Sequence, residues 1–287
     1  MDIHIGHSPD PDDAFMWYPL DAHSGPQPAK IDTGPYRFVH VLQDIQSLNE
    51  RSQRGDLEIT ALSFHQYPFV ADRYALTSCG ASMGDGYGPM VVARRSSGLT
   101  IDDLGRVKIA IPGRRTSAMA ALSLFLGRPL VHYDVVPFDQ ITRSVASGRY
   151  DAGLIIHEGQ LTYDREGLQL VVDLGQWWHR TRQLPLPLGG NAIRRDLGDR
   201  MPALCRILRA SIDYALAHRQ DAIGYAMQYA RGLDTELADR FVGMYVNKWT
   251  LDLGPQGRGA VDRFLAEAAQ MDLVPAIDPI DVIEPVP

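Results

Sequence analysis

Short apolar runs alternate with amphipathic segments along the chain. Short branched apolar runs indicate strands, whereas apolar residues three or four positions apart indicate helices. The first third of the chain therefore predicts a β-α-β-α-β order, which is typical of a mostly parallel sheet. The expected strands are Ile3–His7, Phe38–Leu42, Leu57–Ser63, Tyr74–Ser78 and Met90–Ala93, and the expected helical segments are Asp12–His23, Asp44–Arg54 and His65–Asp72.

A second β-α-β pattern follows the first. Its expected strands are Val107–Ile111, Val131–Val136, Asp151–Ile156 and Leu170–Leu174, with helices over Ser117–Leu126 and Phe138–Ser147. Extended sequence resumes at Gly189–Arg194 after a Pro-rich stretch. The remainder is predicted to be helical before a Pro-rich tail, with helices at Met201–His218, Gln220–Gly232, Leu233–Tyr245 and Gln256–Met271.

The order of these patterns predicts an α/β protein with two lobes. We expect residues 94–186 to form a second lobe, inserted into a first lobe that consists of residues 1–93 and 187–287. Two extended segments, near Met90–Ala93 and Leu186–Ile193, are expected to cross between the lobes. A fold of this class closes about a hinge and binds a small ligand between its lobes.

Composition excludes several classes of partner. Of the 287 residues, 45% are hydrophobic and 22% are charged, and the formal net charge of −7 argues against nucleic acid and anionic membranes as partners. No stretch approaches the ~18 continuous apolar residues of a membrane span, and the opening residues lack a secretory signal pattern. Cys79 and Cys205 have no metal-ligand spacing, so free thiols and a cytoplasmic location are expected.

A titratable side chain stands at the end of one predicted strand. The apolar run Ala152–Ile156 is followed directly by His157 and Glu158. Ligands bind at the carboxyl ends of strands in open α/β sheets, and histidine suits proton transfer near neutral pH. His157 is therefore either a general base or a histidine satisfied by the neighbouring backbone. His7 and His65 also stand at strand ends, but neither is followed by such a compact polar cluster.

The segment from Pro112 to Ser117 is a candidate anion site. A strand, a glycine and then Thr116 and Ser117 at a helix start offer two hydroxyls and unpaired amide groups to a carboxylate. Arg114 and Arg115 add positive charge beside them. The alternative is that Thr116 or Ser117 simply caps the helix.

Small hydroxyl groups and carboxylates follow two other strands. Ser8, Asp10 and Asp12 lie in the turn after the first strand, where they either cap the next helix or form a lip that binds ligand hydroxyls. Ser63 closes the third strand. Because side chains alternate along a strand, only one of Leu62 and Ser63 is expected to line the cleft.

Several kinds of catalytic site are disfavoured. The histidines form neither an HExxH motif nor a two-histidine, one-carboxylate spacing, so no metal is expected. The glycine-rich segment 80–88 lacks the Rossmann and P-loop spacings. A Gly-x-Ser-x-Gly elbow is absent, and neither cysteine lies near a base in the sequence, which argues against covalent hydrolysis.

Taken together, these segments resemble one family. The segments that match in order are Ser8-Pro9-x-Pro11-x-Asp13-x-Phe15, Thr116-Ser117, Ile156-His157-Glu158-Gly159 and Leu186-Pro187-Leu188-Gly189-Gly190. In this order they are similar to the 1,4-dihydroxy-6-naphthoate synthases of the futalosine route to menaquinone. The resemblance extends through about residue 250.

The resemblance implies a fold, a reaction and a set of site residues. It implies a type II periplasmic-binding-protein-like fold and a cofactor-free lyase that fragments cyclic dehypoxanthinyl futalosine to 1,4-dihydroxy-6-naphthoate. His157 would be the general base that starts the fragmentation. The candidate substrate-binding residues are Ser8, Ser63, Thr116, Ser117, Glu158 and Gly189.

The first turn departs from the family pattern. Asp10, Asp12 and Ala14 stand where the family typically carries Cys, Asn and Thr, so this lip is more acidic and the true substrate stays open. The alternatives are a non-catalytic solute-binding or sensing protein for a small carboxylate, and a chorismate dehydratase. The expected partner is a small carboxylate substrate, with the chain acting as a monomer or homodimer.

Overall fold

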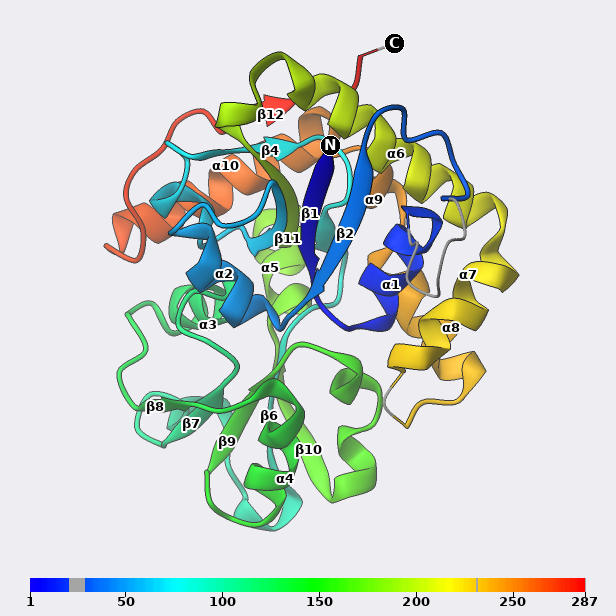
Figure 1. Cartoon of the computed structure of the whole chain (residues 1–287). Coiled ribbons are helices and arrows are strands. Elements are labelled where there is room, and N and C mark those ends of the chain that lie inside the picture. The colour runs from blue at the N-terminus through cyan, green and yellow to red at the C-terminus, as the bar shows by residue number, and fades with distance from the viewer. Residues whose placement is uncertain (21–28, 231, 287) are drawn as a thin grey trace.

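The computed structural model describes residues 1–20, 29–230 and 232–286. Two sheets divide it into two lobes, which lie one above the other in Figure 1. We call the part built on the seven-stranded sheet the first lobe and the part built on the five-stranded sheet the second lobe. The predicted helix Asp12–His23 extends past Leu20, so its last three residues lie outside the described residues.

The first lobe is built on a mixed sheet in the order β12-β4-β11-β3-β1-β2, with β5 paired to β11. Its strands are β1 (Asp2–His7), β2 (Arg37–Leu42), β3 (Ile59–Ser63), β4 (Tyr74–Thr77), β5 (Ser82–Gly84), β11 (Leu186–Arg194) and β12 (Val282–Ile283). β1 runs parallel to β2 and β3, whereas β11 runs antiparallel to β3 and β4. The parallel pairing brings the carboxyl ends of β1 and β3, and hence Ser8 and Ser63, to one edge of the sheet.

The second lobe is built on a sheet in the order β10-β6-β9-β7-β8. Its strands are β6 (Met90–Arg94), β7 (Ile109–Ile111), β8 (Tyr133–Val135), β9 (Ala152–Ile155) and β10 (Leu168–Asp173). β7 runs parallel to β8 and β9, so the loops after β7 and β9 leave the same edge. These two loops carry the Thr116–Ser117 segment and His157.

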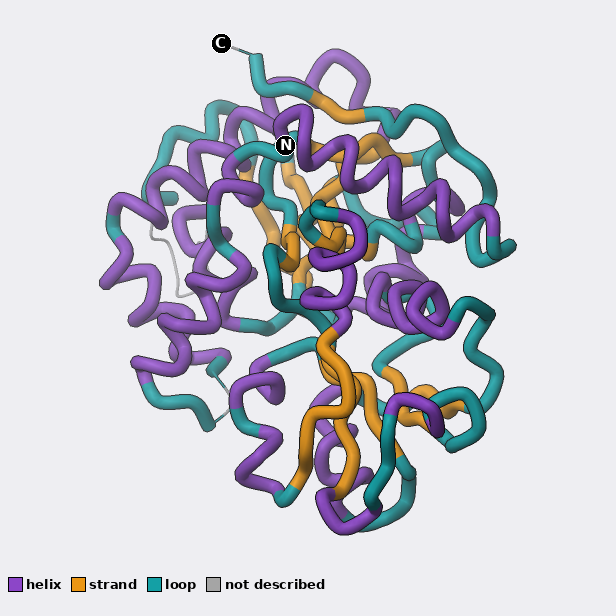
Figure 2. Tube along the Cα trace, turned by 180° about the vertical axis from the view of Figure 1, so that it is seen from behind, coloured by secondary structure: helices purple, strands orange, loops and turns teal. Residues whose placement is uncertain are grey.

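Helices cover both sheets, and Figure 2 shows the helical layer of the first lobe from behind. The first lobe contains α1 (Pro11–Trp17), α2 (Ile45–Ser52), α6 (Met201–Ala217), α7 (Arg219–Ala226), α8 (Thr235–Tyr245), α9 (Lys248–Leu251) and α10 (Gly254–Gln270). α4 (Ile141–Ala146) packs against the second sheet, whereas α3 (Ser117–Leu126) and α5 (Leu174–Arg182) lie where the lobes meet, and both contact β11. Phe15 and Trp17 of α1 are fully buried in a core shared with α6, α7 and α8.

The two lobes share apolar packing. One core cluster contains Leu62 of β3, Phe64 just after it, Ile109 of β7, Leu122 of α3 and Phe264 of α10. Because α3 packs against both β11 and α10, its N-terminus is held close to the end of β3. This packing brings the Thr116–Ser117 segment of the second lobe next to the first sheet.

Several sequence predictions were wrong in detail. Leu174–Arg182 is a helix where the sequence predicted none, because the burial of Trp178 depends on Phe264, which is distant in the chain. His65–Asp72 holds only a 3₁₀ turn over Tyr67–Phe69. The segment 80–88 contains β5, and the Pro-rich tail contributes β12, because both pair with strands distant in the sequence.

The two strands near the predicted lobe boundaries, β6 and β11, belong to different sheets. β6 pairs with β9 and β10 of the second lobe, whereas β11 belongs to the first sheet. The boundaries at 93/94 and 186/187 stay predictions. None of the helices in the described residues is long and apolar enough to cross a membrane.

Candidate active site

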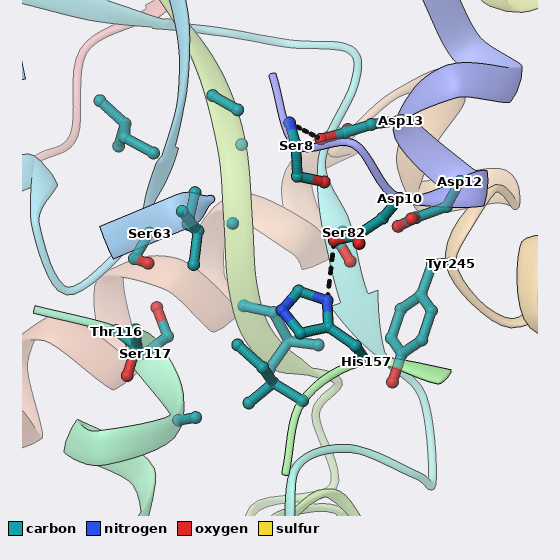
Figure 3. A pocket seen from close by; sticks show the side chains of 18 of the residues that line it. Ser8, Asp10, Asp12, Asp13, Ser63, Ser82, Thr116, Ser117, His157 and Tyr245 are labelled. Atoms are coloured by element: carbon teal, nitrogen blue, oxygen red, sulfur yellow. Dashed lines mark hydrogen bonds and ion pairs between the residues drawn. The ribbon is translucent and has the colours of Figure 1, made fainter. Parts of the chain in front are cut away.

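A cavity of about 130 Å³ lies between the lobes. The turn after β1 and the ends of β3 and β11 form one wall, and the Thr116–Ser117 segment with the end of β9 forms the other. Figure 3 shows Ser63, Thr116 and Ser117 on one side of His157, with Asp12 and Tyr245 on the other. The predicted site residues that line it are Ser8, Ser63, Thr116, Ser117, His157 and Gly189.

His157 follows β9 and lies in this cavity with its side chain only 13% exposed. Its Nδ1 lies 2.7 Å from Oδ2 of Asp10, a carboxylate of the first lobe that is itself 3% exposed. The Phe138 ring packs against the imidazole, with a centroid separation of 4.0 Å. Nε2 is buried and has no hydrogen-bond partner in the described part of the chain.

The charge state of His157 reflects two opposing effects. Burial disfavours the imidazolium ion and lowers the pKa, whereas the charge of Asp10 and the hydrogen bond to it raise the pKa. The charges of Glu158 and Asp12 act in the same direction as Asp10, and the net result is that the pKa of His157 is raised. The ring is therefore protonated more readily than a free histidine and titrates as part of a carboxylate cluster.

The turn after β1 forms an acidic lip of Asp10, Asp12 and Asp13. Ser8 N donates a hydrogen bond of 2.8 Å to the Asp13 carboxylate, which favours the charged form. Burial nevertheless raises the pKa of Asp13 to about 6. Burial and the charges of Asp13 and Asp10 raise the pKa of Asp12. Part of the acidic lip is therefore able to hold protons near neutral pH. Ala14, the third departure from the family pattern, is buried in the core.

Of the two roles that the sequence left open for this turn, capping is not the one that the Asp10 side chain takes. Asp10 is the N-cap residue of α1, yet its side chain makes no capping hydrogen bond. The carboxylate pairs with the imidazole of His157 instead.

The hydroxyl groups of Thr116 and Ser117 have different partners. Thr116 Oγ1 accepts from Met119 N and donates to Gly113 O, so this hydroxyl caps α3 and its only proton is used within the chain. Ser117 Oγ accepts from His65 N at 3.2 Å, and within the described residues no acceptor takes its proton. Ser117 is therefore the better placed of the two to donate to a ligand.

Ser63 is held by a residue that the sequence analysis did not single out. Asn49 of α2 donates Nδ2 to Ser63 Oγ at 3.1 Å and accepts from Ser63 N at 2.9 Å. Gly189 of β11 lies opposite Ser63 in the antiparallel register. Both Leu62 and Ser63 line the cavity, so the expectation that only one of them would do so was wrong.

Glu158 lies outside the cavity that holds the other candidates. It lines a neighbouring cavity of about 240 Å³, together with Phe138, Thr142 and His157. Its carboxylate acts on His157 through charge, whereas Asp10 acts through both charge and a hydrogen bond. His157 therefore lines both cavities, whereas Glu158 lines only the second.

The other histidines at strand ends are structural. The two ring nitrogens of His65 lie within hydrogen-bond distance of the carbonyl oxygens of Thr116 and Leu273, to which only the ring can donate, and burial lowers its pKa to about 4, so it stays neutral. His7 contacts Ser8 O and the His40 ring.

Asp10, His157 and Glu158 bring three potential ligand atoms within 4.8 Å of one another. Two ligand atoms on one tetrahedral zinc ion would stand roughly 3.4 Å apart, given metal–ligand distances near 2.1 Å. The 2.7 Å separation of His157 Nδ1 and Asp10 Oδ2 is a hydrogen-bond distance. The arrangement fits a hydrogen-bonded histidine and carboxylate rather than a metal centre.

Tyr245 is a site residue that the sequence did not reveal. It lies at the end of α8 and lines the cavity, and its hydroxyl donates to Gln160 Oε1 of the second lobe at 2.8 Å. Burial raises the pKa of Tyr245, so the phenol stays protonated. A helical tyrosine at a core spacing carries no sequence signal for such a role, because only the packing of α8 over the cleft brings it there.

Comparison with known proteins identifies the family. A family model described as menaquinone biosynthesis matches residues 3–270. The chain is 41% identical over 267 residues to the 1,4-dihydroxy-6-naphthoate synthase of Thermus thermophilus, covering 93% of each chain. It is 35% identical over 284 residues to the enzyme of the same name from Streptomyces coelicolor, covering 96% of each.

Solved structures confirm the fold. A structural-genomics protein of Archaeoglobus fulgidus is 42% identical, with a TM-score of 0.87 and coverage of 95% of this chain and 98% of that one. The alkanesulfonate-binding protein of Xanthomonas axonopodis, at 14% identity, covers 96% and 94% with a TM-score of 0.72. A Candida albicans protein with the generic periplasmic binding protein fold, also at 14%, covers 99% and 97% with a TM-score of 0.69.

These matches confirm the resemblance and the two-lobed, periplasmic-binding-protein-like architecture predicted from the sequence. The chain belongs to the menaquinone biosynthesis family that includes the 1,4-dihydroxy-6-naphthoate synthases.

Proposed function

We propose that this protein is a cofactor-independent carbon–carbon lyase that fragments cyclic dehypoxanthinyl futalosine to 1,4-dihydroxy-6-naphthoate. Family membership supports the pathway, and the relatives' name supports the product. The observation that carries the reaction type is the buried imidazole of His157 in the cavity, whose Nδ1 is bonded to Asp10 while Nε2 has no partner in the described residues. The buried thiols of Cys79 and Cys205 support a cytoplasmic location.

His157 would act through Nε2 as the general base. With Nδ1–H donated to Asp10, the lone pair on Nε2 is available to accept the substrate proton whose removal starts the fragmentation. The imidazolium ion that forms is stabilised by the adjacent carboxylate, so proton transfer does not leave an uncompensated buried charge. A base placed in this way typically contributes about 10²–10⁴ in rate.

The two ends of the cavity suit different parts of the substrate. Ser117 and the first amides of α3 offer donors to the naphthoate carboxylate, helped by the helix dipole. At the other end, Ser8 and Asp12 suit the hydroxyl groups of the remaining polyol portion. His157 lies between these ends, where the bond to be broken would sit.

The direct test is incubation of the purified protein with cyclic dehypoxanthinyl futalosine, followed by chromatographic detection of the naphthoate. The Thermus thermophilus enzyme is the positive control, and His132→Asn, which changes an exposed histidine, is the matched control for His157→Asn. We expect product from the wild type and from His132→Asn, and loss in His157→Asn. Substrate binding without product from the wild type would indicate a solute-binding protein instead.

A further inference from the structure

We propose that Asp10 is a positioning residue for His157, so that the catalytic base is assembled from both lobes. This inference rests on the proposed function only for its effect on turnover. The pairing itself stands on geometry: Oδ2 of Asp10 lies 2.7 Å from Nδ1 of His157, and the two side chains are 3% and 13% exposed.

The Asp10 side chain pairs with His157 and does not make the capping bond that is usual at its position. Aspartate at an N-cap position usually accepts from the first turn of its helix, which typically contributes about 1 kcal/mol. Here the Asp10 side chain makes no such bond with α1, and Asp13 takes the nearby amide of Ser8. The Asp10 side chain therefore points across the cleft to His157, while the bond from Ser8 N to Asp13 still holds the start of α1 to the preceding turn.

The bond decides which ring nitrogen carries the proton. A neutral imidazole has one N–H, and a carboxylate can only accept, so the pairing with Asp10 places the proton on Nδ1. The lone pair is then on Nε2, which is buried and has no partner in the residues that the structure describes. The opposite tautomer would leave Nε2 protonated and unable to act as a base.

The pair crosses the boundary between the lobes. Asp10 lies in the turn between β1 and α1 of the first lobe, and His157 follows β9 of the second. A second bond crosses close by, from Tyr245 of α8 to Gln160. Separation of the lobes would break both bonds, so the tautomer needed for catalysis is enforced only in the closed arrangement.

Several charged groups surround the ring, and a test must separate their effects. Asp12 and Asp13 face His157 from the acidic lip, Glu158 follows it in sequence, and the neutral phenol of Tyr245 lines the same cavity. Asp12 acts on the ring through charge alone, whereas Asp10 acts through charge and a hydrogen bond. Removing either negative charge should lower the pKa of His157, but only removal of Asp10 should change the tautomer.

The first experiment needs no substrate. Histidine labelled with ¹⁵N in its ring reports the tautomer and pKa of His157 by NMR, with the signal assigned from His157→Asn. We expect Nδ1–H in the wild type and in Asp12→Asn, and a mixture of tautomers with a lowered pKa in Asp10→Asn and Asp10→Ala. Glu58→Gln is the matched control, because His4 and Glu58 form a similar 2.8 Å pair far from the cavity, and it should change only the His4 signal.

The second experiment uses turnover as a function of pH. In Asp10→Asn we expect kcat to fall by roughly 10²-fold or more, with KM little changed and the acidic limb of the profile moved to lower pH. Glu58→Gln should keep the wild-type profile. Unchanged tautomer and pKa in both Asp10 variants, or a loss of kcat without movement of the acidic limb, would overturn the proposal. If the wild type makes no product, the proposed function fails, while the NMR experiment still decides the role of Asp10.

Discussion

Two buried histidines, His65 and His157, stand in similar places in the sequence and differ in what they can do. Each lies just beyond the carboxyl end of an apolar strand, β3 for His65 and β9 for His157. His65 contacts two carbonyl oxygens, and burial lowers its pKa to about 4. His157 contacts the Asp10 carboxylate, which together with the charges of Glu158 and Asp12 more than offsets its burial, and its pKa is raised.

The difference shows that the partner, and not the strand end, determines the chemistry of a buried histidine. Burial keeps His65 neutral, because its contacts with two carbonyl oxygens are too weak to offset the loss of water, and those contacts give it a structural role between the end of β3, α3 and the segment that follows α10. The carboxylate gives His157 an acceptor for one nitrogen and a counter-charge for the proton that the other would gain. In each case the partner comes from a distant part of the chain.

Replacing each histidine with an amide side chain should distinguish the catalytic role of His157 from the structural role of His65, with the largest effect of any variant. His157→Asn should lower kcat by about 10²–10⁴ while the fold is retained, because the base is lost. His65→Gln should leave most of the turnover and lower the melting temperature instead. Steady-state kinetics and thermal unfolding of both variants check this, and a loss of turnover in His65→Gln as large as that in His157→Asn would contradict the distinction.

The low pKa of His65 predicts a pH-dependent stability. An unfolded chain takes up this proton near pH 6.5, whereas the folded chain resists it until about pH 4. Stability is therefore full above pH 6.5 and falls as the pH drops toward 4, by about 3 kcal/mol from this one group. Denaturant unfolding of the wild type and His65→Gln at several pH values should show this difference in slope. Parallel pH dependences in the two proteins would show that His65 is not the group responsible.

Ser117 and Thr116 should respond differently to the loss of a hydroxyl. Ser117→Ala should weaken binding of 1,4-dihydroxy-6-naphthoate by about 1.5–3 kcal/mol, since a bond to a charged acceptor is lost. Thr116→Val should instead cost about 1 kcal/mol of stability, because its hydroxyl caps α3. Calorimetric titration and thermal unfolding distinguish the two effects. A larger loss of affinity in Thr116→Val would mean that the cap also contacts the ligand.

The smallest expected effect concerns the second bond between the lobes. Tyr245→Phe removes the hydroxyl that donates to Gln160, three residues beyond His157, and should lower the free energy of unfolding by about 1 kcal/mol. The base itself is untouched, so the acidic limb of the pH profile should stay in place. A shift of that limb as large as in Asp10→Asn would show that closure as a whole, and not Asp10, determines the state of His157.

Much of the architecture was accessible from the sequence, because local patterns report on local burial. Alternating and branched apolar runs predicted β1, β3 and β9, and helical spacing predicted α3, α6 and α10 to within a few residues. The sequence did not predict the short strands β5 and β12 or the helix α5, because their burial depends on neighbours far away in the chain.

For the site, the sequence by itself determined which residues stand at strand ends and helix starts, and so it predicted His157, Ser63, Ser117 and the family. Only the tertiary structure decided which of these groups meet. It paired Asp10 with His157 across the lobes, turned Glu158 toward a separate cavity and engaged the Thr116 hydroxyl as a cap. The physical reason is that the charge and proton position of a buried side chain depend on the few atoms within hydrogen-bond reach, and those atoms come from segments that no local pattern connects.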